Sequence, residues 1–281
     1  MNFFHRKNLR EDTYFAILER NVFNERIGYI CPMRFILFFS LLLSGFLCAQ
    51  VNVKDSLHSV SIIGIGGGIN APSADLKTRF DYFTSIHANY YRKQASGLIW
   101  GADISYYFGN KVIEDHVLNG IDTEDGFIIG GNGTLYEPLF FMRGYSTSVK
   151  IGKLFPVIGP NKNSGIYLMA GGGYLQHKIR IETERNAFVP ALTKEYLKGY
   201  DRLTNGILFQ PTLGYLHLSN SRLLNFSIQL EYYLGFTQNR RSFNFDEIAA
   251  DKNRRNDNFL NVRLNWLLPV YKKKAKDFYY F

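Results

Sequence analysis

The sequence predicts an all-β protein, namely an antiparallel up-and-down transmembrane β-barrel of eight strands. Three observations carry this prediction. Several segments alternate strictly between apolar and polar residues over nine to eleven positions, which is the length that a tilted strand needs to cross a bilayer. The connections between these segments are alternately long and short. Aromatic residues make up 16% of a chain whose hydrophobic content is an ordinary 46%, as expected where only alternate residues meet lipid and aromatics gather at both interfaces.

The chain opens with a segment typical of a secretory signal peptide. Residues 35–48 form the one apolar run that comes near the length of a membrane span, with Arg34 before it and Ala49 behind it. A positive residue, an apolar run too short to cross a bilayer and a small exit residue are the parts of such a signal. We therefore predict a signal peptide over residues 33–49, with cleavage after Ala49.

This signal divides the chain into three parts. Residues 1–32 are expected to be an upstream extension from a start codon assigned too early, with a genuine cytosolic extension as the alternative. Residues 50–281 are expected to form a single outer-membrane barrel domain. Both cysteines, Cys31 and Cys48, precede the cleavage site, so the exported domain should use no disulfide and no thiol chemistry. The formal net charge is +9. We nevertheless expect no nucleic-acid partner, because the chain is predicted to be exported.

The strands follow from the alternation of side chains. The clearest lie near the C-terminus, where residues 224–234 and 260–268 alternate apolar and polar side chains without interruption. Residues 100–108 and 145–151 show weaker versions of the same pattern, and Pro211 predicts a bulge in the sixth strand. The eight predicted strands are residues 57–69, 82–92, 98–109, 143–155, 166–182, 205–218, 223–236 and 258–270.

The connections test this assignment independently. They run 12, 5, 33, 10, 22, 4 and 21 residues in order. Short periplasmic turns and long extracellular loops are typical of outer-membrane barrels, and an even strand count returns the C-terminus to the periplasm. In the longest link, Gly126–Gly131 and Thr134–Phe141 are expected to pair as a hairpin outside the membrane. If that hairpin entered the membrane, the barrel would have ten strands.

The polar faces of the strands predict the contents of the barrel. An eight-stranded barrel has an interior just wide enough for side chains to fill. Two acids and two bases in so narrow a lumen would be costly unless they pair. We therefore predict a salt-bridged plug in a polar, side-chain-filled interior, with a selectivity filter as the alternative. The predicted interior network consists of Asp103, Lys150, Glu231 and Arg263.

A soluble secreted barrel of the lipocalin type would need the opposite orientation, with the charged faces turned to solvent. The acidic residues of the longest connection are interpreted as an ordinary solvated loop, with divalent bridging to lipopolysaccharide as the alternative. These residues are Glu114, Asp115, Asp122, Glu124, Asp125 and Glu137. The six histidines are scattered and show no spacing suited to zinc, so no metal and no cofactor are predicted.

The C-terminal ending completes a resemblance to a known family. Phe278-Tyr279-Tyr280-Phe281, together with the signal peptide and the alternating strands, resembles the small outer-membrane β-barrel proteins of Gram-negative bacteria, with their porin-like and OmpA-like barrel domains. A terminal Phe after the last strand is that family's assembly signal, although here Lys272–Lys276 separates the ending from the last strand. The resemblance implies an outer-membrane location, contact with lipid and lipopolysaccharide, and insertion by the barrel assembly machinery.

A second, shorter resemblance concerns catalysis. His217-Leu218-Ser219-Asn220, followed by Glu231, resembles the His-x-Ser-Asn…Glu arrangement of the outer-membrane lipid A deacylases. In that family the histidine activates the serine and the glutamate orients the histidine. Here Ser219 is expected at a periplasmic turn, and Glu231 should lie about 30 Å away along the next strand. A simple hairpin turn explains the same residues.

The fold alone does not name an activity, because such barrels include pores, adhesins, enzymes and structural proteins. We predict a non-enzymatic outer-membrane protein that is structural or interacts through its long extracellular loops. A small-solute channel and a hydrolase resembling the lipid A deacylases are the alternatives. The sequence names no ligand for the loops.

Overall fold

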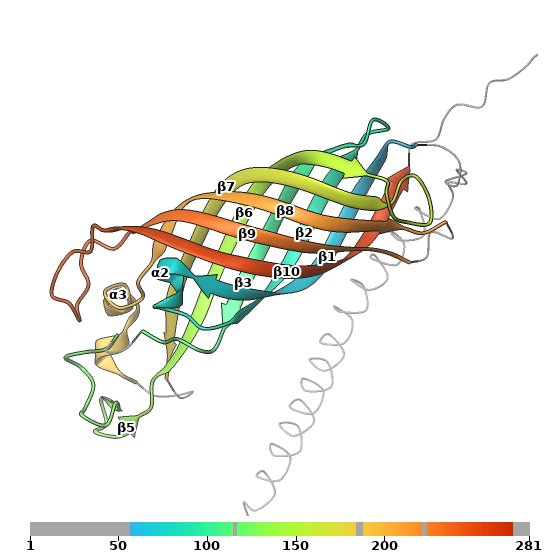
Figure 1. Cartoon of the computed structure of the whole chain (residues 1–281). Coiled ribbons are helices and arrows are strands. Elements are labelled where there is room, and N and C mark those ends of the chain that lie inside the picture. Colours follow the sequence, from blue (N-terminus) through green and yellow to red (C-terminus); the bar gives the residue numbers. More distant parts are fainter. Residues whose placement is uncertain (1–56, 115–116, 184–187, 221–223, 272–281) are drawn as a thin grey trace, which may run out of the picture. The chain divides into compact units, whose positions relative to one another are not determined.

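The computed structural model describes residues 57–114, 117–183, 188–220 and 224–271 (Figure 1). The predicted upstream extension and signal peptide, and the aromatic C-terminal ending, lie outside these residues. None of the helices within the described ranges is long and apolar enough to cross a membrane.

Eight antiparallel strands close into a barrel, in the ring order β1-β10-β9-β8-β7-β6-β3-β2. This confirms the predicted fold class and the predicted strand count. The strands are β1 (Val60–Ser73), β2 (Phe83–Lys93), β3 (Leu98–Gly109), β6 (Leu139–Phe155), β7 (Gly165–Glu182), β8 (Thr204–Leu218), β9 (Asn225–Asn239) and β10 (Arg254–Tyr271).

The hairpin in the longest connection stays outside the barrel. β4 (Ile128–Ile129) pairs only with β5 (Leu135–Tyr136), in a two-stranded sheet of its own. The ten-stranded alternative is therefore wrong.

Several details of the strands differ from the sequence prediction. β1 continues to Ser73, four residues past its predicted end, and β6 begins at Leu139, four residues before its predicted start. β10 begins at Arg254, four residues before the predicted start, because hydrogen-bonded pairing with β9 continues into a polar stretch that carries no apolar alternation. Pro211 produces no bulge: Phe209 pairs with Leu234 and Thr212 with Glu231 in one unbroken register. Since proline lacks an N–H group, it interrupts the ladder locally without shifting it.

At mid-height of the barrel, the apolar side chains face outward and the polar ones face inward. On β10, Leu260, Val262 and Leu264 are exposed, whereas Asn261 and Arg263 between them are fully buried. A soluble barrel would have the reverse arrangement, so the lipocalin-type alternative is wrong. The exposed apolar band is the surface that a bilayer covers in a membrane barrel.

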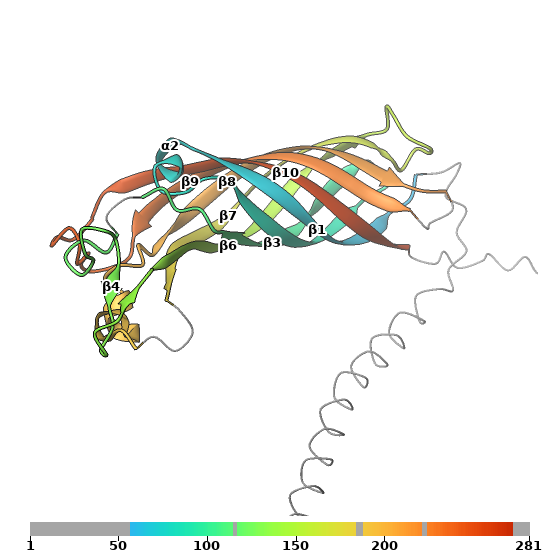
Figure 2. The same cartoon turned by 90° about the horizontal axis from the view of Figure 1, so that it is seen from below.

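The long connections gather at one end of the barrel and carry the remaining short elements (Figures 1 and 2). α2 (Ala74–Lys77) lies between β1 and β2, and the β4–β5 hairpin lies between β3 and β6. η1 (Pro190–Leu192) and α3 (Lys194–Leu197) lie between β7 and β8. We call this end the loop end and the opposite one the turn end.

Candidate functional site

The four charged residues of the predicted interior network lie at one level inside the barrel. Asp103 on β3 and Lys150 on β6 belong to one wall, and Glu231 on β9 and Arg263 on β10 belong to the wall across the lumen. All four side chains are at most 1% exposed. The alternation of the strands places each of them inward, and the ring order sets the two pairs opposite each other.

The structure joins these residues into a closed ring of four ion pairs. Within the walls, Lys150 Nζ lies 2.9 Å from Asp103 Oδ2, and Arg263 Nη2 lies 2.7 Å from Glu231 Oε2. Across the lumen, Lys150 Nζ lies 2.7 Å from Glu231 Oε1, and Arg263 Nη2 lies 3.3 Å from Asp103 Oδ1. Each base contacts both acids. Because the ring holds two acids and two bases, it carries no net charge.

Neutral side chains add hydrogen bonds around this charge ring. The Ser148 hydroxyl donates to Asp103 Oδ2 at 3.0 Å, and the Tyr233 hydroxyl donates to Glu231 Oε2 at 3.1 Å. Arg263 Nη2 also donates to the Tyr233 hydroxyl, at 3.0 Å. Buried charges are tolerated where ion pairing and hydrogen bonding compensate their desolvation. Every charge here is ion-paired, whereas Arg263 Nε and Nη1 are buried without a hydrogen-bond partner.

An aromatic layer closes the lumen above the charge ring, on the side of the loop end. The rings of Tyr233 and Phe259 stack with centroids 4.2 Å apart. Tyr107 and Phe83 meet Phe259 edge to face, each with a centroid separation of 5.4 Å. All four side chains are buried, so this layer separates the charge ring from the loops.

A second apolar layer closes the lumen at the turn end. Ile62, Leu154, Tyr167, Leu216 and Leu267 are among its buried members. The interior is therefore polar at mid-height and apolar at both ends. Sequence reasoning missed the two apolar layers, because a few inward aromatic or aliphatic residues do not disturb a pattern read from the outward face.

A second buried charge cluster holds the loops over the barrel mouth. Glu114 bridges two arginines from different connections: Oε2 lies 2.6 Å from Arg79 Nε, and Oε1 lies 3.0 Å from Arg202 Nε. Arg202 also pairs with Asp246 at 2.5 Å, and burial raises the pKa of that carboxyl above its ordinary value. These residues, the loop clasp, join all four long connections.

The loop clasp corrects one interpretation of the sequence. Glu114 belongs to the acidic stretch that was taken as a solvated loop, yet its carboxylate is half-buried and bridges two buried arginines. The sequence held only a weak indication of the loop clasp. Arg79 and Arg202 each lie a few residues before a barrel strand, where their side chains can reach over the barrel mouth. Nothing in the local sequence indicates which acid they meet.

The residues of the catalytic alternative are not brought together. His217 faces outward on β8, where its ring stacks on Phe226 with centroids 4.8 Å apart. Glu231 faces inward and pairs with the two bases of the charge ring, opposite Thr212 on β8. Ser219 follows the end of β8, where its backbone N–H donates to Asn225 Oδ1. Across the described ranges, no three His, Cys, Asp or Glu side chains form a group that could hold a metal.

No protein-family model and no curated protein matches the sequence. Several solved structures are similar. Neisserial surface protein A is 9% identical, covering 74% of this chain and 96% of its own, with a TM-score of 0.39. Ail, the attachment invasion locus protein of Yersinia pestis, is 13% identical, covering 75% and 99%, with a TM-score of 0.35. OprG from Pseudomonas aeruginosa is 10% identical, covering 77% and 99%, with a TM-score of 0.35.

The geometry of the chain itself identifies its fold. The strands form a closed ring, the outer wall is apolar, and the interior is filled. Short turns lie at one end and long loops at the other. These are the features of small barrels that span bacterial outer membranes. The chain therefore has the fold of the small outer-membrane β-barrel proteins.

Proposed function

We propose that this chain is an integral outer-membrane protein that conducts no solutes and acts through its extracellular loops, as a structural or a binding protein. The observation that carries this proposal is the charge ring, which spans the lumen from wall to wall between two apolar layers. A path for ions would have to break four buried ion pairs and pass both layers. The interior therefore supports a plug and not a selectivity filter.

The distribution of the connections sets the orientation in the membrane. Long loops are extracellular and short turns periplasmic in this class of barrel. The loop clasp then faces the outside of the cell, and the end of β10 faces the periplasm. Contact with outer-membrane lipid, including lipopolysaccharide, follows from this placement, and insertion by the barrel assembly machinery belongs to the same proposal.

The loop end offers a surface suited to binding a partner. A groove of about 460 Å³ lies between the connections, lined by Ile121, Pro190, Ala191, Tyr196, Tyr200 and Phe245. Nearby, Phe188 is 69% exposed and Ile248 is 80% exposed. Exposed apolar side chains on a polar loop surface are typical of interaction sites. The ion pairs of the loop clasp join the connections that carry these residues.

Two measurements test the proposal. Membrane fractionation with heat-modifiable gel mobility should recover a folded barrel from the outer membrane, and recovery only from the soluble periplasm would refute the location. Planar bilayers containing the purified chain should show no single-channel steps. Regular conductance steps would instead favour the small-solute channel. No feature of the described residues favours the hydrolase.

A further inference from the structure

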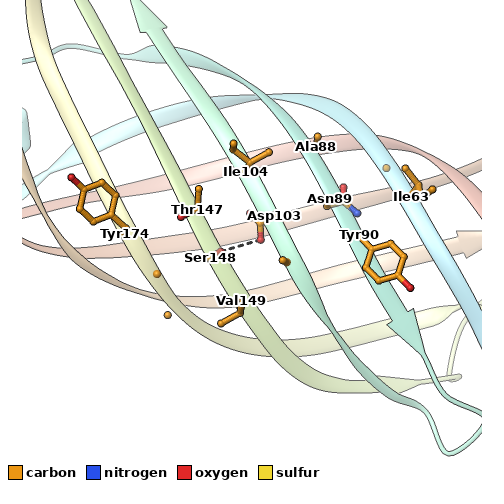
Figure 3. A pocket seen from close by; sticks show the side chains of 14 residues that line it. Ile63, Ala88, Asn89, Tyr90, Asp103, Ile104, Thr147, Ser148, Val149 and Tyr174 are labelled. Carbon is orange, nitrogen blue, oxygen red and sulfur yellow. Dashed lines mark hydrogen bonds between the residues drawn. The ribbon is translucent and has the colours of Figure 1, made fainter. Parts of the chain in front are cut away.

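One side of the outer wall is hollowed. A furrow of about 650 Å³ crosses five neighbouring strands, from Ile63 on β1 through β2, β3 and β6 to Tyr174 on β7 (Figure 3). A second hollow of about 460 Å³ shares Ala102, Val149 and Gly172 with the furrow and extends toward the turn end, to Trp100. The furrow lies where outward-facing small residues from neighbouring strands meet, namely Ala88, Ala102, Thr147 and Gly172.

Two cations stand on the same strands, nearer the loop end. Arg143 on β6 lies directly opposite Lys178 on β7, and both positions face outward. The Arg143 guanidinium donates to the backbone carbonyls of Met142 and Gly109, and no carboxylate of the described residues lies within ion-pair distance of it. Lys178 is 45% exposed, and its Nζ lies 3.9 Å from Asp201. Both cations are thus available to an anion outside the barrel.

A polar belt lies between the cations and the furrow, and Tyr174 of this belt also lines the edge of the furrow. Tyr145 and Tyr174 lie on β6 and β7 with ring centroids 6.0 Å apart, and the Tyr174 hydroxyl donates to Gln176 Oε1 at 3.0 Å. Tyrosines of this kind mark the membrane interface in barrels. Arg143 is four residues from Thr147, so the cations lie about 13 Å along the strand from the furrow. The order along the wall is therefore cations, interface, apolar hollow.

We propose that this wall binds one phosphorylated outer-leaflet lipid, with its phosphate on Arg143 and Lys178 and an acyl chain in the furrow. The inference rests on the proposed outer-membrane location. A phosphate accepts charge-assisted hydrogen bonds from both cations, while small side chains below leave room for a hydrocarbon chain. In the outer leaflet, a lipid with phosphate directly above several acyl chains has the chemistry of lipid A.

A second copy of the chain is a poorer occupant of the same wall. Two copies in one membrane share an orientation, so a two-fold interface on this wall would bring patches of the same height together. The cations of one copy would then face those of the other. A phosphorylated lipid removes that repulsion instead of creating it.

The chain offers matched substitutions for the furrow. A Cβ atom on Gly172 would meet only Leu208 O, at 3.5 Å, so Gly172→Leu can fill the furrow without a backbone clash. Gly67 also faces outward, and its Cβ would meet only Ser85 O, at 3.5 Å. It lies on β1, where Ile63 and Gly64 line the edge of the furrow but Gly67 itself does not. Gly67→Leu therefore adds the same side chain to the outer wall outside the furrow.

The cations have matched controls as well. Arg254 and Lys252 are exposed at the loop end beside β10, which lies opposite β6 in the ring. The double variant Arg254→Gln/Lys252→Gln removes the same net charge as Arg143→Gln/Lys178→Gln. All four replaced side chains face solvent or lipid, so heat-modifiable mobility should remain in every variant and will show that each is folded.

The test counts purified lipid A bound to the detergent-solubilised full chain by native mass spectrometry. The wild type should bind one lipid A, and millimolar inorganic phosphate should not displace it. Arg143→Gln/Lys178→Gln should weaken binding about tenfold or more, Gly172→Leu should weaken it measurably, and both controls should bind as the wild type does. Equal losses in variants and controls, or a dimer abolished by Gly172→Leu, would overturn the proposal. If the chain is a folded outer-membrane barrel but the variants and the controls bind lipid A equally, the lipid site is refuted while the proposed outer-membrane location stands.

Discussion

Lys150 and Glu231 face each other across the lumen, with Lys150 Nζ 2.7 Å from Glu231 Oε1. They belong to β6 and β9, two strands that are not neighbours in the ring. The contact therefore ties opposite walls of the barrel together. Together with the second cross-lumen pair, between Arg263 and Asp103, it connects the two walls, so the charge ring both fills the lumen and holds the walls together.

Removing one member of the charge ring should destabilise the barrel strongly. Lys150→Met leaves Asp103 and Glu231 with a single base between them, and an uncompensated buried charge costs about 3 to 5 kcal/mol. The midpoint of urea unfolding in lipid vesicles should fall accordingly. The neutral pair variant Lys150→Met/Glu231→Gln should lose less, because Asp103 and Arg263 remain paired. Equal losses in the two variants would contradict this reasoning.

The loop clasp should hold the cap closed against proteases. Glu114→Ala leaves Arg79 and Arg202 without their common partner, so the long loops should open more often. Trypsin added to intact cells should then cleave the loops faster than in the wild type. Glu124→Ala removes an exposed acid from the same connection and serves as the control. Equal cleavage rates for both variants would show that the clasp does not order the loops.

Two adjacent glycines should differ sharply in their tolerance of a methyl group. A Cβ on inward-facing Gly171 would lie 2.3 Å from Val149 O and 2.6 Å from Lys150 Cγ. Gly171→Ala must push apart β6 and β7 beside the charge ring, at a cost of about 1 to 3 kcal/mol. Outward-facing Gly172→Ala has room and should be neutral. Unfolding midpoints of the two variants provide the comparison, and a neutral Gly171→Ala would contradict the packing described here.

Ser219→Ala should leave the acylation of lipid A unchanged. The glutamate that a deacylase triad requires is held by Lys150 and Arg263 inside the barrel, and His217 faces outward. Mass spectrometry of lipid A from cells that express the wild type or the variant measures this directly. A deacylated species that disappears with Ser219→Ala would restore the hydrolase.

The sequence predicted the parts of this structure that follow from period 2. Alternation assigned an inward direction to Asp103, Lys150, Glu231 and Arg263, and it also separated the two faces of every strand. It did not predict which charges meet. Lys150 is in register with Gly101, so it reaches Asp103 diagonally, and its contact with Glu231 depends on the closure of the ring.

The loop clasp could not be predicted from the sequence for a related reason. Arg79, Glu114 and Arg202 lie in three connections without periodicity, and their meeting depends on how the barrel mouth positions the loops. The outer furrow was missed because a small residue on an apolar face looks like any other member of the alternation. Gly172 and Ala102 become a hollow only when the register sets small side chains on adjacent strands near one another.

The central claim is that the barrel spans the outer membrane with a closed lumen. Single-channel recording in planar bilayers tests it most directly, with the wild type beside the charge-ring variant Lys150→Ala/Glu231→Ala and the outer-wall control Val149→Ala. The wild type and the control should show no conductance steps, and the charge-ring variant should show none either, because both apolar layers remain. Regular steps from the folded wild-type barrel would contradict a closed lumen.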